Sequence, residues 1–173
     1  MILLVTLFAL QTVMSQTTKE ADPKDVASID SIMKAVYDVI SGDKGKPRDW
    51  DRFRSLFYAD ARLIPSGKNA QTGVIGARML SADDYVKRVE PVFAANGFFE
   101  REMARHVDIY GNIAQVFSTY ESRHAQHDPK PFARGINSFQ LFNDGKRWWV
   151  ITIYWEAETP ENPIPNKYLK NRN

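Results

Sequence analysis

The chain has 173 residues, 43% of them hydrophobic and 25% charged, which is typical of one soluble globular domain. Its 23 basic and 21 acidic residues are spread along the sequence and leave a net charge of +2, which argues against a nucleic-acid partner. The absence of cysteine excludes disulfides, a thiol nucleophile and thiolate metal sites.

Residues 1–15, MILLVTLFALQTVMS, are predicted to be a secretory signal peptide. They contain an apolar run, no charge appears before Lys19, and Val13 and Ser15 suit the positions just before a cleavage site. The stretch is too short for a stable transmembrane helix. We therefore expect a secreted or periplasmic protein without stable membrane insertion, whose mature chain starts near Gln16. The alternative is a buried N-terminal helix or strand.

After a polar linker (16–21), helical signals dominate the first half of the chain. Asp22-Pro23 starts an amphipathic helix that Gly42 ends, because apolar residues recur there every three or four positions. Asp49 caps a short second helix. A short strand is expected over 61–65 and a loop over 66–76. Ser81 caps a third helix, in which Pro91 should cause a kink or a break before Asn96-Gly97 ends it.

From Phe98 the hydrophobic period changes to two, which predicts strands near 98–110, 113–124, 132–142 and 147–157. The Pro- and Asn-rich tail, 159–173, is expected to be irregular. Helices followed by consecutive strands indicate an α+β fold, with helices on one face of a curved antiparallel sheet.

The runs FRSLFYADARLIP, VDIYGNIAQV and DGKRWWVITIYW, in this order, resemble the SnoaL-like (polyketide cyclase-like) branch of the nuclear transport factor 2-like superfamily. The resemblance covers a domain at 22–158. It implies a cone-shaped sheet with the N-terminal helices on its concave face, a small-molecule pocket at its mouth and often a dimer. Ketosteroid isomerase-like relatives use an Asp as base where this chain has Pro65, so their acid/base residues do not carry over.

Two turns set the register of the predicted sheet. Gly111-Asn112 looks like a two-residue turn, which places Arg105 opposite Ser118 and Met103 opposite Tyr120. The turn Asn143–Gly145 places one set of side chains on a common face: Asn137, Phe139, Leu141, Trp149, Ile151, Ile153 and Trp155.

The helix-facing side of this sheet is apolar near Gly111 and becomes polar farther along the strands, as a pocket wall would. The residues predicted to bind a ligand there are Arg101, Met103, Arg105, Ser118, Tyr120, Asn137 and Trp155. The alternative is that the polar residues are solvated strand ends. Strict alternation puts the nearby carboxylates on the opposite face: Glu100, Glu102, Asp108, Glu121, Glu156 and Glu158.

Because no carboxylate is predicted in the pocket, binding of a small anionic or oxygen-rich molecule, guided by Arg101 and Arg105, is favoured over catalysis. The alternative is a cofactor-independent isomerase, dehydratase or cyclase that uses His124 as base and Tyr120 as hydrogen-bond donor. His124 also suits a solvated strand end. With His127 and Asp128 it suggests a metal site, but a loop offers no fixed geometry, so neither a metal nor a cofactor is expected.

The opposite face of the sheet is predicted to carry Trp148, Val150, Thr152 and Tyr154, with Phe117 and Ile136 beside them. A contiguous aromatic patch usually marks an interface. We expect a homodimer through this outer face. The alternative is that the C-terminal tail covers it with Ile164 and Tyr168.

Overall fold

The structure, a computed structural model, describes residues 19–69 and 71–171; the predicted signal peptide lies outside them. The helices are α1 (Pro23–Val26), α2 (Ile29–Ile40), α3 (Trp50–Ser55), α4 (Ala82–Asn96) and the short 3-10 helix η1 (Asn166–Leu169). The strands are β1 (Phe57–Lys68), β2 (Ile75–Ala77), β3 (Phe99–Tyr110), β4 (Ile113–Arg123), β5 (Ala133–Asn143) and β6 (Trp148–Ala157).

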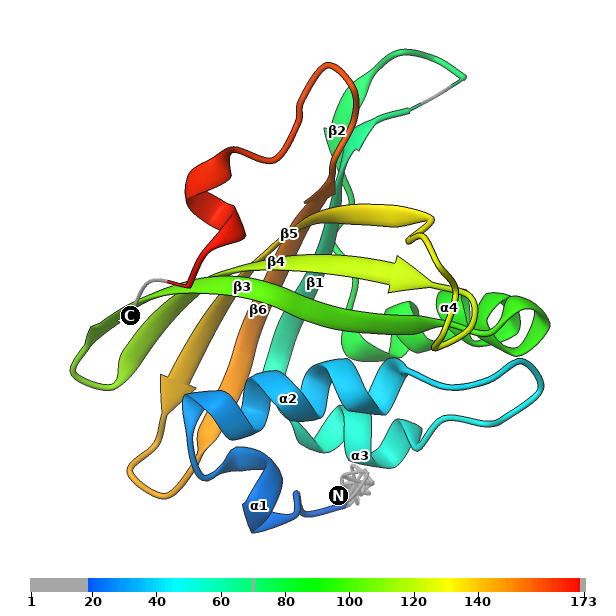
Figure 1. Cartoon of the computed structure of the whole chain (residues 1–173). Coiled ribbons are helices and arrows are strands. Elements are labelled where there is room, and N and C mark those ends of the chain that lie inside the picture. The colour runs from blue at the N-terminus through cyan, green and yellow to red at the C-terminus, as the bar shows by residue number, and fades with distance from the viewer. Residues whose placement is uncertain (1–18, 70, 172–173) are drawn as a thin grey trace, which may run out of the picture.

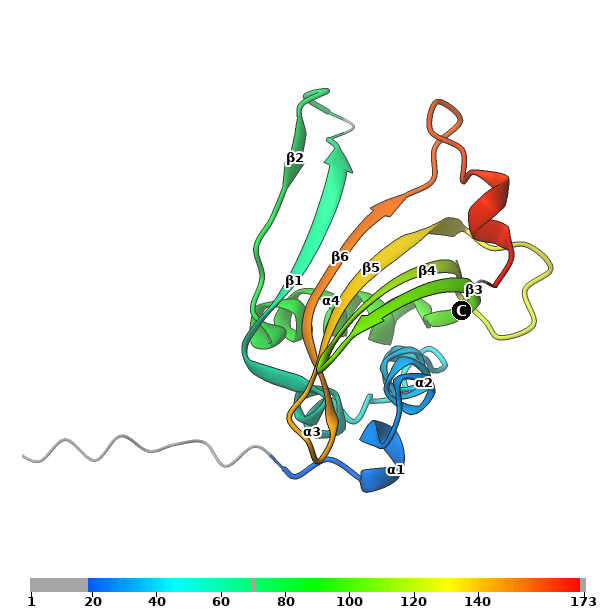
Figure 2. The same cartoon turned by 90° about the vertical axis from the view of Figure 1, so that its left-hand side faces the viewer.

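The strands form one curved sheet in the order β2-β1-β6-β5-β4-β3, and the helices α1 to α4 lie on its concave side (Figures 1 and 2). This confirms the predicted α+β cone. Neighbouring strands are antiparallel except β1 and β6, which run parallel, so the sheet is mixed rather than purely antiparallel. The core lies between helices and sheet, where Ile32, Phe53, Val116 and Phe139 are almost wholly buried.

The helices follow the capping signals closely. Asp49 accepts a hydrogen bond from the backbone of Arg52, and Ser81 forms a complete capping box with Asp84. The prediction of one helix from Asp22 to Gly42 is wrong. Ser28 is extended and caps α2 with its hydroxyl, which separates α1 from α2. α4 continues through Pro91 as one helix, so the expected break is absent. No helix in the described residues is long and apolar enough to span a membrane.

The segment predicted as a short strand and a loop is a long hairpin. β1 runs on to Lys68, and β2 returns against it with Ser66 opposite Ala77 and Lys68 opposite Ile75. This hairpin extends beyond the rest of the sheet (Figure 2). The prediction of a loop over 66–76 is therefore wrong at both ends, which belong to β1 and β2.

The register of β3 on β4 is as predicted from the turn as far as Arg105, which lies opposite Ser118. A β-bulge at Met103 then changes it, because Glu102 rather than Met103 lies opposite Tyr120. A one-residue slip exchanges the two faces of a strand. Beyond the bulge, Glu100 and Glu102 therefore face the helices, while Arg101 and Met103 face outward. For these four residues the predicted faces were wrong.

A second bulge lies in β6, and it makes part of the predicted assignment of β6 side chains to the two sheet faces wrong. Leu141 lies opposite Val150 and Gln140 opposite Thr152, which leaves Ile151 as the extra residue. Trp155 and Ile153 face the helices as predicted, but Val150 joins them and Trp149 turns outward. The Trp149 indole donates to Asp144 (2.8 Å) on the outer face.

The C-terminal tail lies on the outer sheet face at β3 and β4 (Figure 1). The Tyr168 ring packs on Phe117 with the ring centroids 4.9 Å apart, and the Thr119 hydroxyl donates to the Tyr168 carbonyl (2.5 Å). Its residues 166–169 form η1, where an irregular tail was expected. The tail leaves Tyr58 and Tyr154 exposed at 44% and 47%. It therefore covers only part of this face.

Candidate functional site

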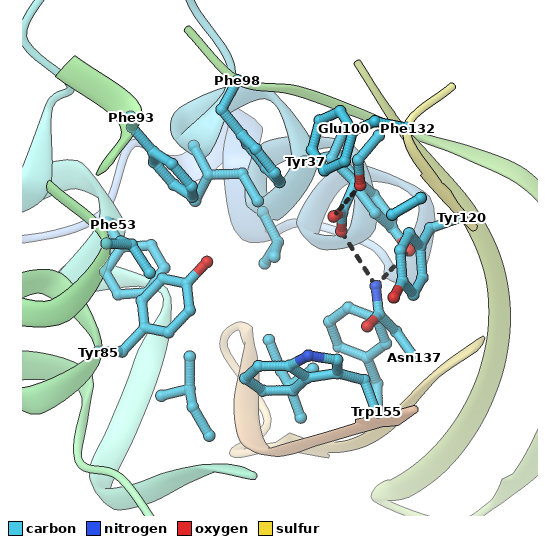
Figure 3. Close-up of a pocket in the computed structure, with 18 residues that line it drawn as sticks. Tyr37, Phe53, Tyr85, Phe93, Phe98, Glu100, Tyr120, Phe132, Asn137 and Trp155 are labelled. Atoms are coloured by element: carbon cyan, nitrogen blue, oxygen red, sulfur yellow. Dashed lines mark hydrogen bonds between the residues drawn. The ribbon is translucent and has the colours of Figure 1, made fainter. Parts of the chain in front are cut away.

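A cavity of about 260 Å³ lies between α2, α4 and the concave face of the sheet (Figure 3). Nine of its eighteen lining residues are aromatic, which makes most of its wall apolar. The aromatic ones are Tyr37, Phe53, Tyr85, Phe93, Phe98, Tyr120, Phe132, Phe139 and Trp155. The polar ones besides the tyrosines and the tryptophan are Glu100, Ser122 and Asn137. An apolar cavity with a few converging polar groups is the usual form of a small-molecule site.

Glu100, at the start of β3, is the centre of the polar wall. Its carboxylate accepts hydrogen bonds from the Ser122 hydroxyl (2.9 Å) and from the Asn137 side-chain amide (3.2 Å). Asn137 also donates to the Tyr37 hydroxyl (3.1 Å), which in turn bonds to Ser118 (2.8 Å). Three strands and α2 thus hold this carboxyl group in one orientation (Figure 3).

The environment of Glu100 changes its acidity. Burial raises the pKa of the Glu100 carboxyl from 4.5 to about 7, while the hydrogen bonds from Ser122 and Asn137 act in the opposite direction. At neutral pH the group therefore exists in both protonation states. Such a group can accept a proton and return it, which is what general acid–base catalysis requires.

Two tyrosine hydroxyls complete the polar lining. Burial, with a smaller contribution from the Glu100 charge, raises the pKa of Tyr85 and of Tyr120, so both stay protonated at neutral pH. Neither hydroxyl has a hydrogen-bond partner within residues 19–69 and 71–171, and that of Tyr85 points into the open space (Figure 3). Gly135 makes room for Tyr120, because a Cβ there would lie 2.6 Å from the Tyr120 hydroxyl oxygen.

The structure brings three of the predicted ligand-binding residues to the cavity, namely Tyr120, Asn137 and Trp155. Ser118 lies behind the wall, where it donates to Glu102 (2.6 Å). Arg105 points toward the helices as predicted, but Glu102 and Asp30 neutralise it, and it does not line the cavity.

The remaining predicted residues lie elsewhere. Arg101 is on the outer face and pairs with Glu121 (2.5 Å), and Met103 is 47% exposed. His124 lies outside the cavity lining and stacks on Phe132 with the ring centroids 4.2 Å apart. Asp128 accepts hydrogen bonds from the backbone amides of His124 and Ala125, so it caps a turn.

Sequence reasoning missed Glu100, the one carboxylate in the described cavity wall, because strict alternation placed it outside. The spacing of Glu102 and Arg105 is a signal that could have indicated the bulge. Residues three apart lie on opposite faces of a regular strand, so an ion pair between these two requires an extra residue between them.

No known family matches the sequence, and no characterised relative was found. Similar solved structures include a nuclear transport factor 2-like protein of unknown function from Silicibacter pomeroyi (14% identity, 76% of this chain and 94% of that chain, TM-score 0.51). Two others come from Novosphingobium aromaticivorans. One is the β subunit of a putative aromatic-ring-hydroxylating dioxygenase (14% identity, 80% of this chain and 95% of that chain, TM-score 0.58). The other is a putative scytalone dehydratase (14% identity, 77% of this chain and 83% of that chain, TM-score 0.52). The chain therefore has the nuclear transport factor 2-like fold.

The raised pKa of Glu100 predicts a pH-dependent stability. The folded state binds this proton more tightly than the unfolded state, so stability falls by up to about 3 kcal/mol as pH rises from 4.5 to about 7. Glu100→Gln keeps hydrogen bonds like those of the protonated acid and removes the charge. Thermal unfolding should show the variant melting roughly 5 °C or more above the wild type at pH 8, and alike at pH 4. A variant that melts lower at pH 8 would contradict this.

Proposed function

We propose that this protein is exported and binds a small, largely apolar molecule in the cavity, where Glu100 moves a proton on it. The reaction class is a cofactor-independent isomerisation or dehydration. The observation that carries the proposal is a carboxyl group in an aromatic cavity, held there by two fixed hydrogen-bond donors. The sequence-based preference for binding alone depended on a cavity without a carboxylate, and that premise no longer holds.

The cavity also limits the charge and size of the ligand. No Lys or Arg lines it in the described part of the chain, so an anionic ligand would meet Glu100 without a compensating charge. This argues against the anionic ligand that Arg101 and Arg105 suggested. A cavity of about 150 Å³ holds one benzene ring, so about 260 Å³ suits a neutral molecule of roughly one or two rings.

The geometry supports a simple division of roles. Ser122 and Asn137 orient the Glu100 carboxylate, which takes a proton from the substrate and returns it at another atom. Negative charge that develops on a substrate oxygen needs a donor, and the Tyr85 hydroxyl is protonated and free to give one. The chain ends the cycle in its initial protonation state, so this scheme requires no cofactor. The name of one similar structure, a putative dehydratase, agrees with this reaction class.

A general chemical probe tests the base without knowledge of the natural substrate. When a base removes the ring C–H proton of 5-nitrobenzisoxazole, the C–H electrons form the third bond of a nitrile, the N–O bond breaks and the ring opens to one coloured cyanonitrophenolate. The flat two-ring molecule suits the cavity. We expect wild-type protein to accelerate this reaction with a rate that rises through a midpoint near pH 7, because the carboxylate is the active form. Glu100→Gln should lower the rate about 100-fold.

Glu156→Gln is the matched control, because Glu156 is an exposed carboxylate on β6 outside the cavity lining. This variant should keep the wild-type rate and pH profile. Equal rates for Glu100→Gln and wild type would show that Glu100 is not the base.

We also propose a homodimer through the part of the outer sheet face that the tail leaves uncovered. Tyr58 packs there against Phe142 and Trp149, with ring centroids 5.8 and 5.6 Å apart, and Tyr154 is 47% exposed. Exposed aromatic patches on sheets commonly form interfaces. Light scattering at micromolar concentration should give the mass of a dimer, and Tyr154→Glu should give a monomer. A wild-type monomer with the same mass as the variant would contradict the dimer.

A further inference from the structure

The hairpin of β1 and β2 is exposed to solvent around its turn. From Lys68 to Met79 every described residue is exposed, and the hairpin extends beyond the sheet (Figures 1 and 2). Val74, Ile75 and Met79 keep 65%, 79% and 67% of their surface exposed. A ribbon of two strands with apolar side chains and no cover is marginally stable alone and usually meets a partner.

The charges on this hairpin are all of one sign. From Ala61 to Ala82 the chain has three basic residues, Arg62, Lys68 and Arg78, and no acidic residue. Lys68 and Arg78 join Arg88 of α4 around a shallow groove without a carboxylate in its lining. Within the described residues none of these cations forms a salt bridge, although arginines elsewhere, such as Arg52 and Arg54, do. The partner of this surface is therefore expected to be anionic.

The arrangement combines an apolar end with cations on its flanks. Lys68 lies opposite Ile75, so their side chains share one face, and Arg78 follows the end of β2 and lines the same groove as Lys68. Val74 and Ile75 lie nearest the turn. Long basic side chains can reach phosphate groups while neighbouring apolar groups enter the boundary between headgroups and acyl chains.

We propose that this hairpin docks the protein on a membrane surface rich in anionic phospholipids. Val74 and Ile75 enter the headgroup boundary, and Lys68, Arg78 and Arg88 bind lipid phosphates. This is peripheral binding by a hairpin, and it is independent of the reaction proposed for the cavity.

A second copy of the chain is a poorer occupant of the same surface. In a symmetric contact through this hairpin, Lys68 and Arg78 would meet the same cations of the partner, and like charges repel. The hairpin of β3 and β4 provides the contrast. It also exposes apolar residues, with Ile109 and Ile113 at 61% and 58%, but it carries Asp108 and has no Lys or Arg between His106 and Tyr120.

Vesicle sedimentation tests the proposal with the full chain. Vesicles of phosphatidylcholine alone are compared with vesicles of equal parts phosphatidylglycerol and phosphatidylcholine, at low and high salt. Wild-type protein should bind the anionic vesicles more tightly, and salt should weaken this binding. Lys68→Gln with Arg78→Gln should weaken it roughly tenfold, and Val74→Ser with Ile75→Ser should also weaken it.

Because all variants share residues 1–18, differences between them report the hairpin. Ile109→Ser with Ile113→Ser removes similar exposed apolar surface from the other hairpin and should bind like wild type. Equal binding of wild type and both variants of the β1–β2 hairpin would overturn the proposal, as would equal binding to neutral and anionic vesicles. Either result would direct the search to an acidic protein partner.

Discussion

The β-bulge at Met103 determines what the cavity contains. On the Gly111 side of the bulge, odd-numbered residues of β3 face the helices, and beyond it even-numbered residues do. The bulge places Glu102 beside Arg105, so that charge is neutralised within the strand. It also turns Glu100 into the cavity and Arg101 outward to Glu121. A regular strand would give the cavity an arginine at this depth and no carboxylate.

The polar network around Glu100 sets both its orientation and its acidity. Within the described residues every deeply buried side-chain nitrogen or oxygen has a hydrogen-bond partner, so the aromatic wall contains no unpaired polar group away from the cavity space. Tyr37, Ser118 and Asn137 link α2 to the sheet and fix the donors that hold the carboxylate. Ionising this carboxyl lowers stability, which is the usual compromise in a site that must carry charge in an apolar place.

The sequence was sufficient for features that depend on local chemistry. The turns at Gly111 and Gly145 have positive φ values of 55° and 89°, which glycine permits, and the caps at Asp49 and Ser81 set the helix starts. The features it did not reveal depend on contacts between distant segments. In the segment EREMAR, residues 100–105, both possible assignments of alternate residues to the two faces of the strand leave polar residues on each face. The hydrophobic pattern therefore could not locate the bulge. The parallel pairing of β1 with β6 and the packing of the tail on Phe117 are likewise nonlocal.

The proposed chemistry depends on a Glu100 carboxyl that lies in the cavity and titrates near neutral pH. Carbon-13 NMR of protein labelled at the glutamate carboxyl carbons measures this directly, with the resonance assigned by its loss in Glu100→Gln. We expect one glutamate resonance with a midpoint near pH 7. A midpoint near the ordinary value of 4.5 would place Glu100 in solvent and contradict both the bulge and the proposed chemistry.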